Sequence, residues 1–141
     1  MSSLAGSAAR RTPPPLSQPV ILVVDDDEYV HATLRAALRG LRATIVRATS
    51  AREGLELARS HRPDLAIVDL GLPDADGYVL TRRLRAEAAL ADMRILILTG
   101  YAPDERTARD AGADGILGKP FRLHEFLDVV HAQLEPRART A

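Results

Sequence analysis

The sequence contains no cysteine, which excludes disulfide bonds, thiolate metal sites and thiol chemistry and is compatible with a cytoplasmic protein. An excess of charge is also missing, because Lys+Arg and Asp+Glu each number 19. No global field therefore favours nucleic acid or an anionic membrane as a partner. No run reaches the roughly 18 to 20 apolar residues that span a bilayer, so no membrane span is predicted.

Histidine clusters of the kind that bind metals are absent as well. The four histidines lie far apart in the chain: His31, His61, His124 and His131. None forms a pair with metal-ligand spacing beside a Cys or Glu cluster. We predict that all four are surface or boundary side chains.

The N-terminal segment lacks the apolar stretch that a secretory signal places after its charges, here Arg10 and Arg11. Residues 1–18 are rich in proline and are predicted to form a disordered leader. With 46% hydrophobic residues, the chain can build one core, which we assign to residues 19–135, and residues 136–141 are predicted to be a flexible tail. We expect a single-domain protein whose output passes through other proteins.

Short aliphatic runs alternate with longer segments of helical period over the rest of the chain. This alternation is typical of an α/β domain with a doubly wound parallel sheet. The five predicted strands are residues 20–24, 43–48, 65–68, 94–98 and 115–117. The connections between them are long enough for one helix each.

The helix that follows the first strand is predicted to place one apolar stripe on the sheet: Val30, Leu34, Leu38 and Leu41. In the last helix, the inward side is predicted to hold Leu123, Phe126, Leu127, Val130 and Leu134. The helix after the second predicted strand is expected to be capped by Ser50, with Glu53 reaching back as in a capping box. Pro63 ends this segment.

The third and fourth predicted helices differ in their apolar content. Residues 77–89 turn Leu80 and Leu84 inward, whereas residues 103–111 offer only Ala108 and Ala111 to a core. A helix that buries so little apolar area is expected to be the least tightly packed one. It could therefore shift at low energetic cost.

Polar residues stand where the predicted strands end, which is the edge where open parallel sheets bind ligands. Asp25, Asp26 and Asp27 follow the first strand, Asp69 follows the third, and Thr99 follows the fourth. Clustered carboxylates about 4 Å apart repel by roughly 4 kcal/mol at an effective dielectric near 20. A divalent cation would compensate, and a hard, oxygen-only site suits Mg²⁺. Asp27 is our candidate for a simple helix cap.

Lys119 follows the fifth strand and is the one lysine among 19 basic residues. Its position beside predicted acids favours a functional ammonium over an ordinary solvated side chain. For Thr99, by contrast, an ordinary β-branched strand residue remains an open alternative.

Four motifs in this order resemble the receiver domain of bacterial response regulators over about residues 19–135. The motifs are Val-Val-Asp25-Asp26, Val-Asp69-Leu-Gly-Leu-Pro73-Asp-Ala-Asp-Gly77, Leu-Thr99-Gly and Lys119-Pro120-Phe121. The resemblance implies a flavodoxin-like (βα)5 fold with strand order 2-1-3-4-5. It also implies a protein that catalyses only its own phosphorylation and dephosphorylation, with a histidine kinase or a histidine phosphotransfer protein as donor.

The resemblance assigns roles to individual residues. Asp69 would accept the phosphoryl group, and Thr99 and Lys119 would bind phosphoryl oxygens. Asp26, Asp69 and the Gly71 carbonyl oxygen would ligate Mg²⁺, and Asp25 would hold a metal-bound water. The Lys119–Pro120 peptide bond would be cis.

One position departs from the family pattern. Receivers usually carry Tyr or Phe three residues before the lysine, as a ring that turns inward when the threonine moves, and here that position is Ile116. Tyr101 is a candidate substitute in the switch, and an exposed loop residue is the alternative. The string Thr99-Gly100-Tyr101 resembles that of a subgroup of stand-alone receivers.

Three other classes of function are alternatives to the receiver: a phosphohydrolase, a pseudo-receiver and a P-loop protein. An aspartate-based phosphohydrolase fits Asp25-Asp26-Asp27 but needs a cap or substrate pocket, and a pseudo-receiver would not need Thr99 and Lys119. A nucleotide-binding P-loop is excluded because Pro120 follows Lys119. Output as a relay intermediate, as a phosphate sink or through the face formed by the fourth and fifth helices stays open.

Overall fold

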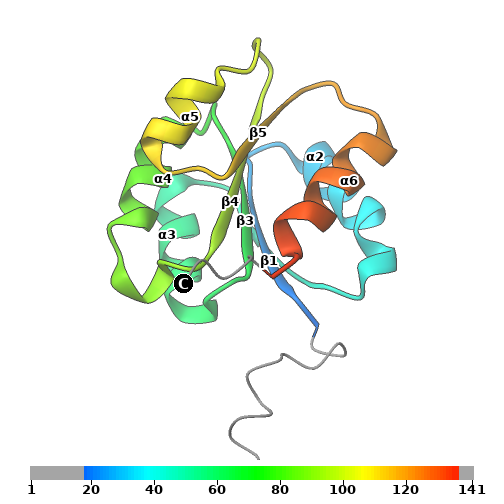
Figure 1. The fold of residues 1–141 in the computed structure, drawn as a ribbon, viewed down its shortest axis with the longest axis horizontal. Coiled ribbons are helices and arrows are strands. Elements are labelled where there is room, and N and C mark those ends of the chain that lie inside the picture. The colour runs from blue at the N-terminus through cyan, green and yellow to red at the C-terminus, as the bar shows by residue number, and fades with distance from the viewer. Residues whose placement is uncertain (1–17, 137–141) are drawn as a thin grey trace, which may run out of the picture.

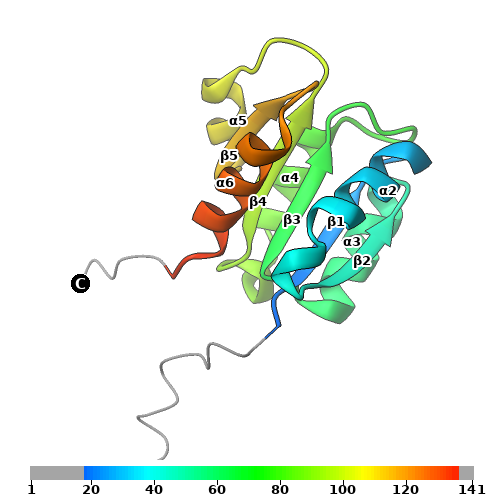
Figure 2. The ribbon, with the colours of Figure 1, turned by 90° about the vertical axis from the view of Figure 1, so that its right-hand side faces the viewer.

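The structure is a computed structural model that describes residues 18–136. Its core is a parallel five-stranded sheet in the order β2-β1-β3-β4-β5, which confirms the predicted fold class (Figures 1 and 2). The strands are β1 (Val20–Val24), β2 (Thr44–Ala48), β3 (Leu65–Asp69), β4 (Arg94–Thr99) and β5 (Gly115–Gly118). Nearly all of the predicted leader and tail lies outside the described residues.

Helices cover both faces of the sheet. They are α2 (Glu28–Ala37), α3 (Ala51–His61), α4 (Gly77–Arg85), α5 (Glu105–Ala111) and α6 (Leu123–Leu134), with short 3₁₀ turns η1 (Arg39–Leu41) and η2 (Ala88–Leu90). Helices α2 and α6 lie on one face, and α3, α4 and α5 on the other (Figure 1). Within residues 18–136, no helix is long and apolar enough to cross a membrane.

Two apolar clusters, one on each face, form the core. Side chains alternate along β1, so that Ile21 joins the cluster under α2 and α6, while Leu22 joins the cluster under α3 and α4. Strands buried on both faces explain why the strand sequences are almost entirely aliphatic. The ends of the strands are therefore supported by apolar packing on both faces of the sheet.

Three strands run one residue further than the sequence predicted. Asp69 pairs with Leu98, and Thr99 pairs with Gly118, so both polar residues belong to the ladder itself. Strand β2 begins one residue later, at Thr44. The consequence for the site is that Asp69 and Thr99 stand on rigid strand ends rather than on loops.

Two predicted helix boundaries differ from the structure: the end of α4 and the start of α5. Helix α4 ends at Arg85 instead of residue 89, because Glu87 adopts an extended ψ of 117° and η2 then buries Leu90. Helix α5 begins at Glu105 instead of residue 103, because the Asp104 carboxylate caps it by accepting from the Thr107 N–H (3.0 Å). As predicted, α5 buries only two alanines.

The predicted capping box at α3 is half correct. Ser50 caps the helix by accepting from the Glu53 N–H (3.1 Å). The Glu53 carboxylate instead accepts from the Thr49 N–H (2.8 Å), because Thr49 also offers its hydroxyl (3.2 Å). On α6, Leu123 is exposed rather than inward, because it occupies the first turn, next to the loop that leaves β5.

Candidate functional site

Two buried carboxylates meet at the carboxyl edge of the sheet. Asp69 is the last residue of β3 and 8% exposed, and Asp25 directly follows the neighbouring β1 and is 1% exposed. Asp26, the next residue, is exposed. One carboxylate oxygen from each of these three aspartates lies within 4.8 Å of the others. The structure thus brings together the three predicted acidic residues.

Lys119 completes the cluster from the end of β5. Its Nζ lies 2.9 Å from Asp69 Oδ1 and 3.5 Å from Asp25 Oδ2. The Lys119–Pro120 peptide bond is cis, as the resemblance implies. Burial lowers the pKa of Lys119, but the hydrogen bond to Asp69 and the negative charges of both aspartates outweigh it, so that the pKa is raised. The ammonium group therefore stays charged beside the acids.

The pKa of Asp25 is raised, first because burial disfavours its charged form and also because of the negative charge of Asp69. The hydrogen bond from the Asp27 N–H (2.9 Å) and the charge of Lys119 oppose this shift without cancelling it. The cluster thus sets three carboxylates against one ammonium, and burial disfavours the charged form of Asp25. A further positive charge would stabilise the cluster.

A magnesium ion fits this donor set. The three carboxylates are hard oxygen ligands, and the exposed position of Asp26 leaves room for the waters that Mg²⁺ retains. Gly71, the predicted carbonyl ligand, contacts Asp69 through its N–H, which donates to Oδ2 (3.0 Å). Its role as a ligand stays a prediction. Receiver domains bind Mg²⁺ at such an acidic pocket, and these residues are the ones that would hold it.

Thr99 is buried at the end of β4 and connects two parts of the site. Its hydroxyl accepts from the Tyr101 N–H (3.0 Å), and its carbonyl accepts from the Lys119 N–H (2.6 Å). The Tyr101 ring points into solvent and is 82% exposed. Ile116 is half-buried on β5 and packs against the cluster under α3 and α4. The switch role predicted for these residues remains a prediction.

Two residues near the acidic cluster, Asp27 and His31, hold the start of α2 through hydrogen bonds. Asp27 caps α2 by accepting from the Tyr29 N–H (2.8 Å), as predicted. His31, predicted to be a surface or boundary side chain, is buried, and its Nε2 contacts the Asp25 carbonyl oxygen (2.6 Å). Its spacing to Leu34 and Leu38, three and seven residues, was the available signal.

Gly77 allows α4 to start directly against the end of β3. A Cβ at this position would lie 2.5 Å from the Asp69 carbonyl oxygen and 2.8 Å from the Leu70 Cα. Any larger residue would therefore have to push the backbone at Asp69. The N-terminus of α4 and the end of β3 are packed as one unit.

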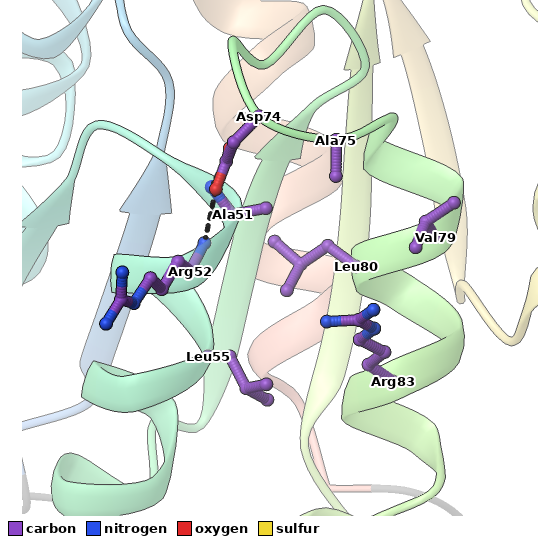
Figure 3. A pocket seen from close by; sticks show the side chains of 8 residues that line it. All are labelled: Ala51, Arg52, Leu55, Asp74, Ala75, Val79, Leu80 and Arg83. Atoms are coloured by element: carbon purple, nitrogen blue, oxygen red, sulfur yellow. Dashed lines mark hydrogen bonds between the residues drawn. The ribbon is translucent and has the colours of Figure 1, made fainter.

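A pocket between α3 and α4 lies apart from the acidic cluster (Figure 3). At its rim, the Asp74 carboxylate accepts from the N–H groups of Ala51 (2.7 Å) and Arg52 (3.0 Å). These bonds lower the pKa of Asp74. They tie the loop after β3 to the start of α3, so the acceptor is braced from this side also.

The parallel sheet and the acidic strand ends define the class of receiver-like α/β proteins. A family model described as "Response regulator receiver domain" matches residues 21–131. The chain belongs to this family, which serves two-component signalling.

Curated relatives and solved structures show the same similarity. The KDP operon transcriptional regulatory protein KdpE of Escherichia coli is 39% identical over 102 residues, which are 72% of this chain and 45% of that protein. The polar-differentiation response regulator DivK of Brucella anthropi is 28% identical over 112 residues, covering 78% of this chain and 91% of DivK. A crystal structure of a response regulator from Chloroflexus aurantiacus has a TM-score of 0.78 at 35% identity, covering 84% and 98% of the chains.

The chain spans about half the length of KdpE and of the mycobacterial MprA response regulators that it matches. Among the alternatives weighed from the sequence, family membership overturns the phosphohydrolase. Lys119, which a pseudo-receiver would not need, contacts Asp69 and Asp25.

Proposed function

We propose that Asp69 accepts a phosphoryl group from a phosphorylated histidine of a histidine kinase or histidine phosphotransfer protein. The observation that carries this proposal is the contact between Lys119 Nζ and Asp69 Oδ1 (2.9 Å), beside two further aspartates. Phosphoryl transfer needs a positioned nucleophile and positive charge around the transferring oxygens. The Asp69 cluster has the residues for both.

The transfer breaks the P–N bond of the donor, whose electron pair returns to the imidazole nitrogen, and forms a P–O bond to the Asp69 carboxylate. Lys119 stabilises the negative charge on the phosphoryl oxygens. The Thr99 hydroxyl oxygen already accepts from the Tyr101 N–H, so its hydrogen is free to be donated to a phosphoryl oxygen. Hydrolysis by water returns the carboxylate and releases inorganic phosphate.

When Mg²⁺ is bound, it supplies the additional positive charge that the transferring oxygens require. Asp25, Asp26 and Asp69 would hold it, with the Gly71 carbonyl oxygen as a further ligand. Burial and the negative charge of Asp69 raise the pKa of Asp25, and a bound cation would favour the charged form of Asp25 and oppose this shift.

The surface around the acceptor supports a protein as the donor. The exposed large hydrophobic side chains among the described residues are Tyr29, Tyr101 and Leu123. Each lies just beyond the carboxyl end of a strand, in the segments that follow β1, β4 and β5. The three side chains thus lie toward the edge of the sheet that carries Asp69, which is the edge that a protein donor would approach.

We further propose a cytoplasmic, single-domain regulator that signals through protein contacts. The DivK comparison supports the single-domain part of this proposal, because the match covers nearly all of that response regulator. The downstream target is open, and neither nucleic acid nor a membrane is a proposed partner.

The test is labelling by a small phosphodonor such as acetyl phosphate, with Mg²⁺ and with a chelator. We expect wild type to be labelled only with Mg²⁺, and Asp69→Asn to stay unlabelled. Asp92→Asn is the matched control, because Asp92 is an exposed aspartate just before β4. Persistent labelling of Asp69→Asn would overturn the proposal.

A further inference from the structure

His31 is a buried polar side chain next to the acidic cluster, and the proposed chemistry does not use it. It is the fourth residue of α2 and 7% exposed, whereas the other three histidines are exposed. Its Nε2 lies 2.6 Å from the Asp25 carbonyl oxygen and 3.2 Å from the Ala48 carbonyl oxygen. Because both partners only accept hydrogen bonds, Nε2 carries a hydrogen and donates it.

A closed ring of hydrogen bonds runs from Asp25 to His31. The Asp27 N–H donates to Asp25 Oδ1 (2.9 Å), and the Tyr29 N–H donates to Asp27 Oδ1 (2.8 Å). The His31 N–H then donates to the Asp27 carbonyl (3.2 Å), and His31 Nε2 returns to the Asp25 carbonyl (2.6 Å). The segment that carries two of the three acids is thus fixed at both of its ends.

We propose that His31 is a positioning residue that sets the affinity of the acidic cluster for Mg²⁺. The Asp25 carbonyl belongs to the rigid peptide plane that joins Asp25 to Asp26. Holding this oxygen restrains the peptide plane from which both side chains project, that of the buried Asp25 and that of the exposed Asp26. The inference rests on the proposed function, since it concerns the same site.

The contact with Ala48 explains why the histidine can act as an anchor. The Ala48 carbonyl also accepts from the Asp25 N–H (3.0 Å), and Ala48 is the last residue of β2. His31 thus holds the first residue after β1 against the end of the neighbouring strand. Without its donor, the Asp25 carbonyl would lose a buried partner, and the loop after β1 could rotate.

The experiment measures Mg²⁺ binding directly, by calorimetry or by amide chemical shifts, without any phosphodonor. We expect His31→Leu, which has no donor, to weaken Mg²⁺ binding about tenfold, the lower range for groups that orient metal ligands. His31→Gln keeps a side-chain N–H donor and should stay within about threefold of wild type. His31→Met is a second variant without a donor, should the leucine variant fail to fold.

Leu38→Ala is the matched control. Leu38 is buried at the other end of the same helix, so its truncation loosens α2 without touching the Asp25 or Ala48 carbonyls. We expect its Mg²⁺ affinity to equal that of wild type. An equal loss in Leu38→Ala, an equal loss in His31→Gln, or no loss in the folded donor-free variant would each overturn the inference.

The outcomes also separate the inference from the proposed function. If wild type binds Mg²⁺ but is not labelled on Asp69, the proposed function fails while the positioning role of His31 stands. If Asp69 is labelled and the donor-free variant binds Mg²⁺ as tightly as wild type, only the inference fails. Absence of Mg²⁺ binding by wild type would overturn both.

Discussion

The two sides of Asp69 are built differently. On the side of β1 and α4, Asp25 is locked by His31, and Gly77 brings the start of α4 against the acceptor backbone. On the side of β4 and α5, residues 100–107 are exposed throughout, and α5 buries only Ala108 and Ala111. We call these the braced side and the open side.

The difference between the sides is mainly one of buried apolar area. Helix α4 buries Leu80 and Leu84 completely, and a buried leucine contributes about 1.5–3 kcal/mol. The two alanines of α5 contribute far less. The braced side is therefore the more tightly packed of the two, while the segment that follows Thr99 is the one that can rearrange at low cost.

The largest expected effect tests the packing contrast. Leu84→Ala on the braced side should lower the free energy of unfolding by about 2–5 kcal/mol, because it leaves a cavity in the core. Ala108→Gly on the open side should cost only about 1 kcal/mol, the helix propensity difference. Urea unfolding measures both, and equal losses would refute the contrast.

A pair of glycines gives the next test. Gly77→Ala should cost about 1–3 kcal/mol through overpacking and should slow labelling of Asp69, because the new methyl group pushes its carbonyl. Gly100→Ala on the open side is the control, since a Cβ there meets no atom within 4 Å. It should change stability by no more than about 0.5 kcal/mol. Unchanged stability and an unchanged labelling rate in Gly77→Ala would show that the backbone on the braced side can move to accommodate a methyl group.

Hydrogen exchange tests where the molecule responds. Phosphorylation should change amide protection in residues 100–111, because the Thr99 hydroxyl would then bind a phosphoryl oxygen. The Tyr101 N–H donates to that hydroxyl and would respond to the change. Residues 65–69 of β3 should keep theirs. Unchanged protection in residues 100–111 would remove Tyr101 and this segment from the switch.

The smallest expected effect concerns acid. Hydrogen bonds from the Ala51 and Arg52 N–H groups lower the pKa of Asp74 below 3.8. Its contribution to stability is therefore complete above that value and is lost as the pH falls through the folded pKa. The difference in unfolding free energy between wild type and Asp74→Asn should shrink as the pH is lowered from 6 to about 2. Asp92→Asn is the control. If the difference in unfolding free energy between wild type and Asp74→Asn does not change with pH, the Asp74 carboxylate does not stabilise the start of α3.

Much of this architecture follows from the sequence. Aliphatic runs identified every strand, and the order of polar residues at their ends placed Asp25, Asp69 and Lys119 at one edge. Both rest on local patterns, namely burial on two faces and the parallel direction of the strands.

The remaining features depend on contacts between distant segments. His31 was expected to be a surface or boundary side chain, and as a buried residue it contacts the Ala48 carbonyl at the end of β2. The exact end of α4 depends on how η2 buries Leu90. Leu123 matched the helical period but occupies a turn beyond the core. Periodicity alone gives no information about such tertiary partners.

The most direct test of the account is to locate the phosphoryl group. After labelling with acetyl phosphate and Mg²⁺, borohydride reduction converts an aspartyl phosphate to homoserine, which peptide mass spectrometry identifies. The account predicts homoserine at position 69 and at no other aspartate. Homoserine at position 25 or 26, or a fully labelled protein without homoserine at 69, would contradict it.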